Sequence, residues 1–418
     1  MCVPIMKTRI RLISFFFSMV VTFASCIEEY SIPDEIKKNY KKQLVVNASI
    51  FSGDKSTIYL SYTTSIGSFH KGEPALNADI TIIGENGYVS PKAEYDKENK
   101  RYLIPTYELP NNTLYALKIL YEGDTYQSEF QPLLLPPEIE KVTWRELDDG
   151  VGLYVSTSGE DVNHRNYLWT YEEDWEIHTE MDFTRPLSQG QYWYSKQKYT
   201  IGNNGKNPYM YCWMRNESAV INIYTTKKLQ TNKVIDHQFL HIPINDIRIS
   251  YIYSILVKQA CLSDQVYNYY DLMQLYFQNS GGLFTPMPTE IEGNLKCISN
   301  PSKKIYGVVF ASKISTKRIF IYESDFKKLS PEYTNCHPIM GGDLYTGDLQ
   351  NDAGWRNAWT KEVTNGAFIY ITSSENLSFL PHTELNQFAI LYPATCMDCR
   401  KTNGATKQRP YFWPNNHE

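Results

Sequence analysis

An acidic cluster is the part of this chain that most resembles catalytic machinery. Glu172, Glu173, Asp174 and Glu176 are close neighbours, and His178 follows them. A pair of carboxylates could act as acid and base in glycoside hydrolysis, but that chemistry needs a fixed separation across a cleft, which sequence neighbours rarely supply. We therefore interpret the cluster as an acidic, solvated strand edge or turn.

Two histidines have a spacing that can bind a metal ion. His237 and His241 are four positions apart, which would place both rings on one face of a helix. The residues around them instead suggest a strand or the end of a loop, where positions four apart are separated by about 13 Å along the chain. No His-Glu-x-x-His motif accompanies them. The sequence therefore predicts no metal site, and nothing in it calls for a cofactor.

The amino-terminal residues have the pattern of a lipoprotein export signal. Lys7, Arg9 and Arg11 precede an apolar run over residues 12–23. The small residues at positions 24 and 25 then directly precede Cys26. We expect residues 1–25 to be a signal peptide and Cys26 to be the site of lipidation. Residues 26–41 then form a polar, acidic tether, and the lipid anchor predicts attachment to the outer membrane.

Six further cysteines lie in the second half of the chain. An even number of cysteines in an exported protein predicts up to three disulfides, whose connectivity the sequence leaves open. The two closest in sequence could instead form a redox pair or half of a zinc site, but no thioredoxin-like βαβ pattern surrounds them, and we favour structural disulfides. The candidates are Cys212, Cys261, Cys297, Cys336, Cys396 and Cys399.

The overall charge argues against two classes of partner. The chain has 41 Lys and Arg residues against 46 Asp and Glu residues, and the signal peptide contains three of the former and none of the latter. The mature chain would therefore carry 38 positive and 46 negative side chains, a net charge of −8. Such a surface does not suit nucleic acid or a polybasic membrane contact. The 33 tyrosines favour strands and a β-rich, extracytoplasmic protein.

The elements that must position these side chains are mostly strands. Residues 42–136 contain six or seven short β-branched or aromatic runs separated by turn residues, a spacing typical of an immunoglobulin-like sandwich. A proline-rich connection places a domain boundary near Pro137. Residues 137–418 predict a larger β-rich domain with one α-helix near residues 263–279, where Ser263 is the N-cap.

An aromatic stretch is the clearest candidate for ligand contact. Tyr192, Trp193, Tyr194 and Tyr199 lie among Ser, Gln, Gly and Lys in a polar segment over residues 188–208. Exposed aromatic side chains on a polar loop suit contact with a sugar, a peptide or a protein. The same side chains could equally pack onto a sandwich and cover it, and the sequence leaves both alternatives open.

Several segments together resemble one family, the Bacteroidota outer-membrane lipoproteins known as domain of unknown function 4249. The matching segments cover nearly the whole mature chain, and the most specific block is central. They are Cys26, residues 44–46, 76–80, 126–128 and 137–139, the central block over residues 253–259, 267–270, 282–288, 293–294 and 300–307, and the tail over residues 396–399 and 410–413.

The resemblance implies a partner and no catalytic residue. Members of this family look like lipoproteins encoded beside TonB-dependent outer-membrane receptors. We therefore expect a surface-exposed outer-membrane lipoprotein that is not an enzyme and serves as an accessory, ligand-binding partner of such a receptor. A cell-envelope adhesion or structural lipoprotein is one alternative, and a hydrolase with an unrecognised site is another.

Overall fold

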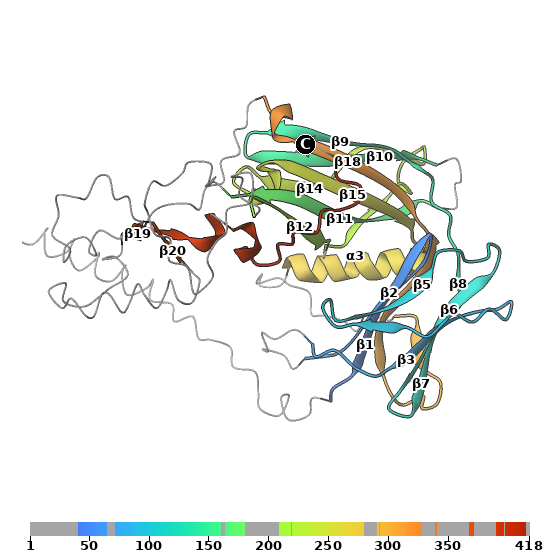
Figure 1. The fold of residues 1–418 in the computed structure, drawn as a ribbon. Coiled ribbons are helices and arrows are strands. Elements are labelled where there is room, and N and C mark those ends of the chain that lie inside the picture. Colours follow the sequence, from blue (N-terminus) through green and yellow to red (C-terminus); the bar gives the residue numbers. More distant parts are fainter. Residues whose placement is uncertain are drawn as a thin grey trace, which may run out of the picture.

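The computed structural model describes residues 41–64, 72–159, 164–179, 209–218, 220–279, 291, 293–327, 339–340, 368–371, 390–396 and 398–414. Most of these residues belong to two β-sandwiches, and helix α3 lies between them (Figure 1). The predicted mainly β fold, with an N-terminal immunoglobulin-like sandwich and one helix, is confirmed for the described part of the chain. Cys26, Cys336 and the aromatic segment from Tyr192 to Tyr199 lie outside the described residues.

The first sandwich packs two five-stranded sheets around one core. One sheet has the order β17 (Ile305–Lys313), β1 (Leu44–Ser52), β2 (Asp54–Tyr62), β5 (Arg101–Thr106) and β4 (Glu94–Asp96). The other has β16 (Leu295–Cys297), β7 (Asp124–Ser128), β6 (Leu114–Tyr121) and β3 (Asp79–Gly84), and β8 (Gln131–Pro132) pairs with β6. Alternate side chains of β1, including Val46, Ala48 and Ile50, are buried in this core, as expected for a strand with one face inward.

Two strands of the first sandwich come from the second half of the chain. β16 pairs with β7, and β17 pairs in parallel with β1, so the sandwich is not made of residues 42–136 alone. Gly307 of β17 lies opposite Val46 with φ +123°, and a Cβ there would stand 1.6 Å from the Val46 carbonyl oxygen. Only glycine fits this approach. A linear division of the chain near Pro137 therefore does not describe how the sheets are built.

The second sandwich packs a three-stranded sheet against a five-stranded one. The smaller sheet has the order β14 (Lys233–Pro243), β10 (Gly150–Ser158) and β9 (Ile139–Leu147). The larger has β12 (Tyr211–Glu217), β11 (Asn166–His178), β15 (Ile252–Cys261) and β18 (Ser315–Tyr322), and β13 (Asn222–Thr225) pairs with β11. Trp169 is fully buried at the centre, and its indole N–H donates to the Gln259 side chain at 2.9 Å. That bond satisfies the one polar atom of a large core side chain.

Helix α3 (Asp264–Asn279) confirms the helix predicted near residues 263–279. The Val266 backbone N–H donates to the Ser263 hydroxyl at 3.4 Å, and the Tyr267 N–H donates to the Ser263 carbonyl at 2.9 Å. Val266 and Tyr270 are buried against Phe310 of β17. The helix therefore begins directly after β15 of the second sandwich and packs onto β17 of the first sandwich. No helix among the described residues is long and apolar enough to cross a membrane.

A fifth sheet, of three short strands, and four short 3₁₀ helices complete the described elements. The sheet has the order β19 (Ile339–Met340), β21 (Ile390–Pro393) and β20 (Phe368–Ile371). The 3₁₀ helices are η1 (Ile247–Ile249), η2 (Glu323–Asp325), η4 (Ala394–Cys396) and η5 (Cys399–Lys401).

The described cysteines include disulfide-bonded residues and thiols. Cys212 of β12 forms a disulfide with Cys399, which fastens the carboxyl-terminal segment to the edge of the larger sheet, and Cys396 is also disulfide-bonded. Cys261 and Cys297 are thiols and form no disulfide, so the prediction that they take part in disulfides is wrong for these two. Cys261 is buried in the core of the second sandwich and Cys297 in that of the first. Each therefore acts as a small apolar side chain in a separate core.

Candidate functional site

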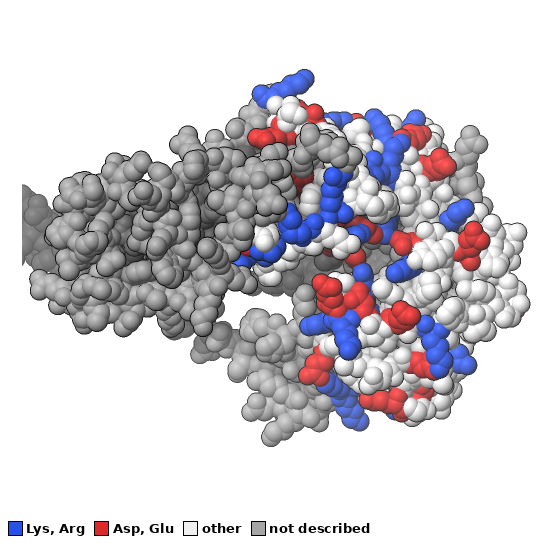
Figure 2. Space-filling model, viewed as in Figure 1, with Lys and Arg blue, Asp and Glu red and all other residues white. Residues whose placement is uncertain are grey.

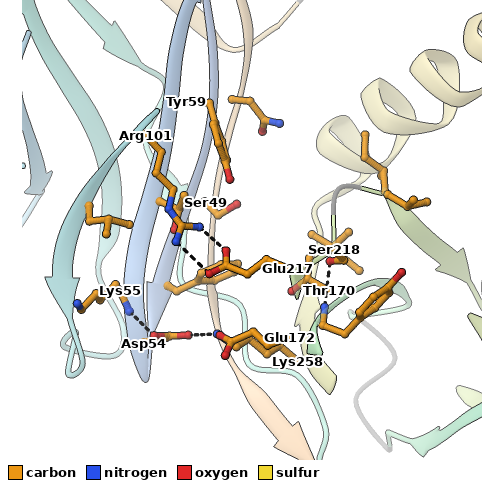
Figure 3. A pocket seen from close by; sticks show the side chains of 18 of the residues that line it. Ser49, Asp54, Lys55, Tyr59, Arg101, Thr170, Glu172, Glu217, Ser218 and Lys258 are labelled. Atoms are coloured by element: carbon orange, nitrogen blue, oxygen red, sulfur yellow. Dashed lines mark hydrogen bonds and ion pairs between the residues drawn. The ribbon is translucent and has the colours of Figure 1, made fainter. Parts of the chain in front are cut away.

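A cavity of about 710 Å³ lies between the two sandwiches (Figure 3). This volume is in the range of ligand pockets in proteins. We call it the inter-module cleft. The first sandwich contributes Asn47, Ser49, Phe51, Asp54, Lys55, Thr57, Tyr59, Arg101 and Leu103. The second sandwich, residues 218–221 and α3 contribute Leu168, Thr170, Tyr171, Glu172, Arg215, Glu217, Ser218, Val220, Ile221, Lys258 and Tyr270.

The alternation of side chains along each strand explains how polar groups come to line the cleft. In β1, the side chains that alternate with the buried Val46, Ala48 and Ile50 point to the opposite face of the sheet, and these include Asn47 and Ser49 of the cleft. The same period places Leu168, Thr170 and Glu172 of β11 on the face opposite the core residues Trp169 and Tyr171. The pattern that fills each core therefore also gives each cleft wall its hydroxyl, amide and carboxylate groups.

One ion pair crosses the cleft between β5 and β12. Both terminal nitrogens of Arg101 donate to the Glu217 carboxylate, one of them at 3.0 Å (Figure 3). The hydrogen bond to Glu217 raises the pKa of Arg101, and the neighbouring Tyr59 hydroxyl contributes in the same direction. Paired nitrogens on paired oxygens fix the geometry of both side chains.

A second set of ion pairs crosses the cleft around Lys258. Its ammonium group contacts Asp54 of the first sandwich and Glu172 of β11. Burial alone would lower the pKa of Lys258, but the two carboxylates outweigh it, and the pKa is raised. Burial likewise would raise the pKa of Glu172, but Lys258 and Arg215 outweigh it, and the pKa is lowered. Lys258 and Glu172 therefore both stay charged at neutral pH, and their opposite charges balance each other.

The acidic cluster is not a solvated edge or turn, so that interpretation is wrong. β11 is a central strand between β12 and β15, and Glu173, Asp174 and Glu176 are each no more than 2% exposed. Cations and donors from neighbouring elements make this burial tolerable. Arg248 and the Tyr253 hydroxyl donate to Glu173 at 2.6 and 2.7 Å, Arg318 donates to Asp174 at 3.3 Å, and the Trp413 indole donates to Glu176 at 2.8 Å.

Of this cluster, Glu172 is the carboxylate that lines the inter-module cleft. Asp174 and Glu176 follow Glu172 at alternate positions of β11, and burial raises the pKa of Asp174 against the opposing effect of Arg215 and Arg318. Figure 2 shows acidic and basic side chains interspersed over the described part of the visible face, without a broad patch of one sign. The charges of the cleft thus follow the pattern of the surrounding surface.

The sequence of the chain matches one family model, described as "Domain of unknown function (DUF4249)", over residues 28–318. The chain belongs to this family. The match spans nearly all strands of both sandwiches and every residue that lines the inter-module cleft. The residues of the cleft therefore all lie within the matched region. No curated protein matches the sequence.

Comparison of coordinates finds solved structures with low overall similarity to this chain, and two of them are as follows. A two-domain fibronectin type III segment from chicken tenascin is 9% identical, with 53% of this chain and 92% of that chain covered and a TM-score of 0.15. A structure described as manganese lipoxygenase of Gaeumannomyces graminis with part of zonadhesin of Komagataella pastoris is also 9% identical. It covers 53% of this chain and 89% of that chain, with a TM-score of 0.16. The sheet pairings given above define the fold of this chain.

The two histidines lie on β14, as the strand interpretation predicted, and have separate partners. His237 packs against Trp169 and Tyr224, and burial lowers its pKa. The His241 ring contacts the Asp149 carboxylate at 3.0 Å. In the part of the chain that the structure describes, no group of three or more His, Cys, Asp or Glu side chains is placed to hold a metal ion.

The sequence analysis missed most residues of the cleft. Asp54, Arg101, Glu217 and Lys258 come from four strands that are far apart in the chain, and none belongs to a recognisable motif. One signal was present at Lys258, which interrupts an otherwise buried strand between Val257 and Gln259. A charged residue in a buried strand requires a partner, and that requirement points to an ion-paired site.

Proposed function

We propose that this protein is a ligand-binding lipoprotein of the outer-membrane surface and that its ligand sits in the inter-module cleft. The observation that carries the proposal is the cleft itself, a cavity of about 710 Å³ whose two walls are supplied by different sandwiches. Ligand sites occur preferentially at such interfaces between modules. The residues on its walls are fixed by strands, which position side chains more rigidly than loops do.

The binding is proposed to be non-catalytic. The three carboxylates that line the described part of the cleft, Asp54, Glu172 and Glu217, are each paired with Lys or Arg. General acid catalysis needs a protonated group near neutral pH, whereas the lowered pKa of Glu172 keeps that carboxylate ionised. This arrangement suits recognition better than proton transfer.

The proposed partner is a TonB-dependent receptor. The support is the lipoprotein signal ending at Cys26 and the likeness of the family to lipoproteins encoded beside such receptors. In this arrangement, acyl chains on Cys26 hold the protein at the membrane, residues 26–41 act as a tether, and the cleft collects a ligand for the β-barrel beside it.

Affinity purification from detergent-solubilised outer membranes tests the proposal. The full-length tagged protein is expected to carry fatty acid on Cys26 and to copurify with a β-barrel receptor. The matched control is Cys26→Ser, which removes the acylated sulfur and is expected to lose both membrane attachment and the receptor. Recovery of the acylated protein without a β-barrel partner would contradict the receptor partnership.

A further inference from the structure

We infer that the inter-module cleft binds a neutral, polyhydroxylated ligand of the oligosaccharide class. The inference rests on the proposed function of the cleft as a ligand site and specifies the chemistry of the ligand. Three features of the cleft walls support it: the ion pairs among the charged side chains, the neutral polar side chains on the strands, and an exposed tyrosine at the rim.

Most charges of the cleft are already paired. Of the four Lys and Arg side chains that line it, Arg101 pairs with Glu217, Arg215 with Glu172, and Lys258 with Asp54 and Glu172, and Lys55 is the fourth. An anionic ligand that binds Arg101 would have to displace Glu217 and leave that carboxylate without its partner, which carries a high energetic cost in a partly buried site. A hydroxyl group both donates and accepts, so it can bind beside an intact ion pair without displacing either member.

Neutral polar groups line both walls of the cleft. On the first sandwich, Ser49 of β1 is the register partner of Thr57 on the neighbouring strand β2, and Asn47 is the partner of Tyr59 in the same sheet. On the second sandwich, Thr170 of β11 lies beside the charged Lys258 of β15. The first wall therefore carries a short row of hydroxyl and amide groups at strand spacing, which matches a ligand that has several hydroxyl groups along its length.

The rim supplies an apolar face for a sugar ring. Tyr59 is 44% exposed and Val220 is 60% exposed, and both line the cleft. A tyrosine ring can pack against the C–H face of a sugar while its hydroxyl group remains in water. A sugar ring has one apolar face and several hydroxyl groups. The cleft offers exposed aromatic and apolar surface for the first and ion-paired polar groups for the second.

The same walls do not suit recognition of a peptide backbone. Extended peptides bind by adding a strand to a free sheet edge, because their amide groups need unpaired backbone partners. β1, β2, β5, β11 and β15 each have a strand on both sides, so their backbone groups are already used, whereas β12, which carries Arg215 and Glu217, is the edge strand of its sheet. These strands offer the cleft a sheet face and its side chains.

Binding measurements on the acylated full-length protein in detergent micelles test the inference. The probes are neutral oligosaccharides on a glycan array, oligogalacturonate as the anionic counterpart, and a library of extended peptides, with calorimetry on each class that binds. We expect a neutral oligosaccharide to bind and Tyr59→Ala to weaken its binding at least tenfold. The matched control is Tyr107→Ala, because Tyr107 is 57% exposed and lies outside the cleft.

A second variant guards against loss of folding in the first. Thr170→Val keeps the shape of the side chain and removes one hydroxyl, so it is expected to weaken the neutral ligand several-fold while the melting curve stays unchanged. The inference is overturned by an array without any neutral binder, by tighter binding of oligogalacturonate, or by neutral binding that neither variant weakens. Peptide binding that Tyr59→Ala abolishes would keep the cleft as the binding site and refute the ligand class. The receptor copurification is independent of all these results.

Discussion

Replacing Lys258 with methionine is the most informative perturbation of the cleft. The side chain is 16% exposed and joins Glu172, which is 16% exposed, to Asp54, which is 33% exposed. Methionine keeps the length and apolar stem but leaves both carboxylates without this cation. Removing one member of a fully buried pair costs about 3–5 kcal/mol, and an exposed pair contributes about 0.2–1 kcal/mol. Because these groups are partly buried, we expect a loss of about 2 kcal/mol in the free energy of unfolding.

Chemical denaturation in urea measures this loss, and a thermal melt should show a decrease of about 4–8 °C. The matched control is Lys296→Met, because the Lys296 side chain is 77% exposed and lies 3.5 Å from Glu129. That variant is expected to cost less than about 0.5 kcal/mol. A double-mutant cycle with Asp54→Asn should show coupling of about 1 kcal/mol across the two sandwiches. Equal losses for the two lysine variants would refute the assignment of Lys258 as an inter-module bridge.

Four further variants test the fold and its charges. Gly307→Ala places a Cβ 1.6 Å from a β1 carbonyl oxygen, so we expect a loss of more than about 3 kcal/mol in urea denaturation; a smaller loss would contradict the parallel pairing of β17. Joint replacement of Cys212 and Cys399 by alanine should cost about 2–4 kcal/mol and speed tryptic cleavage within residues 399–414, and unchanged cleavage would count against the fastening role of this disulfide. The lowered pKa of Glu172 contributes stability that is present above its unfolded pKa and is lost as pH falls through the folded one, so Glu172→Gln should lower the melting temperature at pH 7. The raised pKa of Asp174 reverses this sign, so Asp174→Asn should leave the melting temperature unchanged or raise it, and equal decreases for both variants would refute the reasoning.

Local sequence patterns predicted the strands and the helix well because those elements are determined by nearby residues. The β-branched runs at residues 44–50 and 57–62 lie within β1 and β2, and the three-and-four spacing from Val266 to Tyr270 lies within α3. The apolar and aromatic runs at residues 166–171 and 175–177 flank three acidic residues, and all of them form one strand, β11. The acidic residues between them appear loop-like, and only partners elsewhere in the chain allow them to be buried in a sheet.

Long-range pairing could not be predicted in the same way. Nothing in residues 305–313 shows that this strand inserts beside β1 rather than beside its sequence neighbours, because strand partners are chosen by the packing of the whole sheet. The cleft has the same difficulty. Arg101 and Glu217 are separated by 116 positions, and their pairing becomes visible only when both sandwiches are assembled.

The route of the chain between the sandwiches suggests different roles for the two sets of ion pairs. The chain crosses three times, over residues 133–138, between β15 and β16, and at Ile314, and the first and third crossings are hydrogen-bonded to each other, since the Lys313 N–H donates to the Leu134 carbonyl at 2.8 Å. The Ile314 N–H also donates to Ser52, two residues before Asp54. Lys258 and Asp54 therefore lie near the crossing, where the sandwiches are held together covalently.

Tyr59 lies five positions further along β2, about 17 Å from Asp54 in an extended strand, and the Arg101–Glu217 pair lies beside it (Figure 3). A rotation of one sandwich about the crossing would therefore move Arg101 and Glu217 apart by more than it moves Lys258 and Asp54. Lys258 therefore lies at the end of the cleft nearer to this hydrogen-bonded crossing, and Arg101 lies farther from it. A ligand that widens the cleft should consequently change the environment of Tyr59 before that of Lys258.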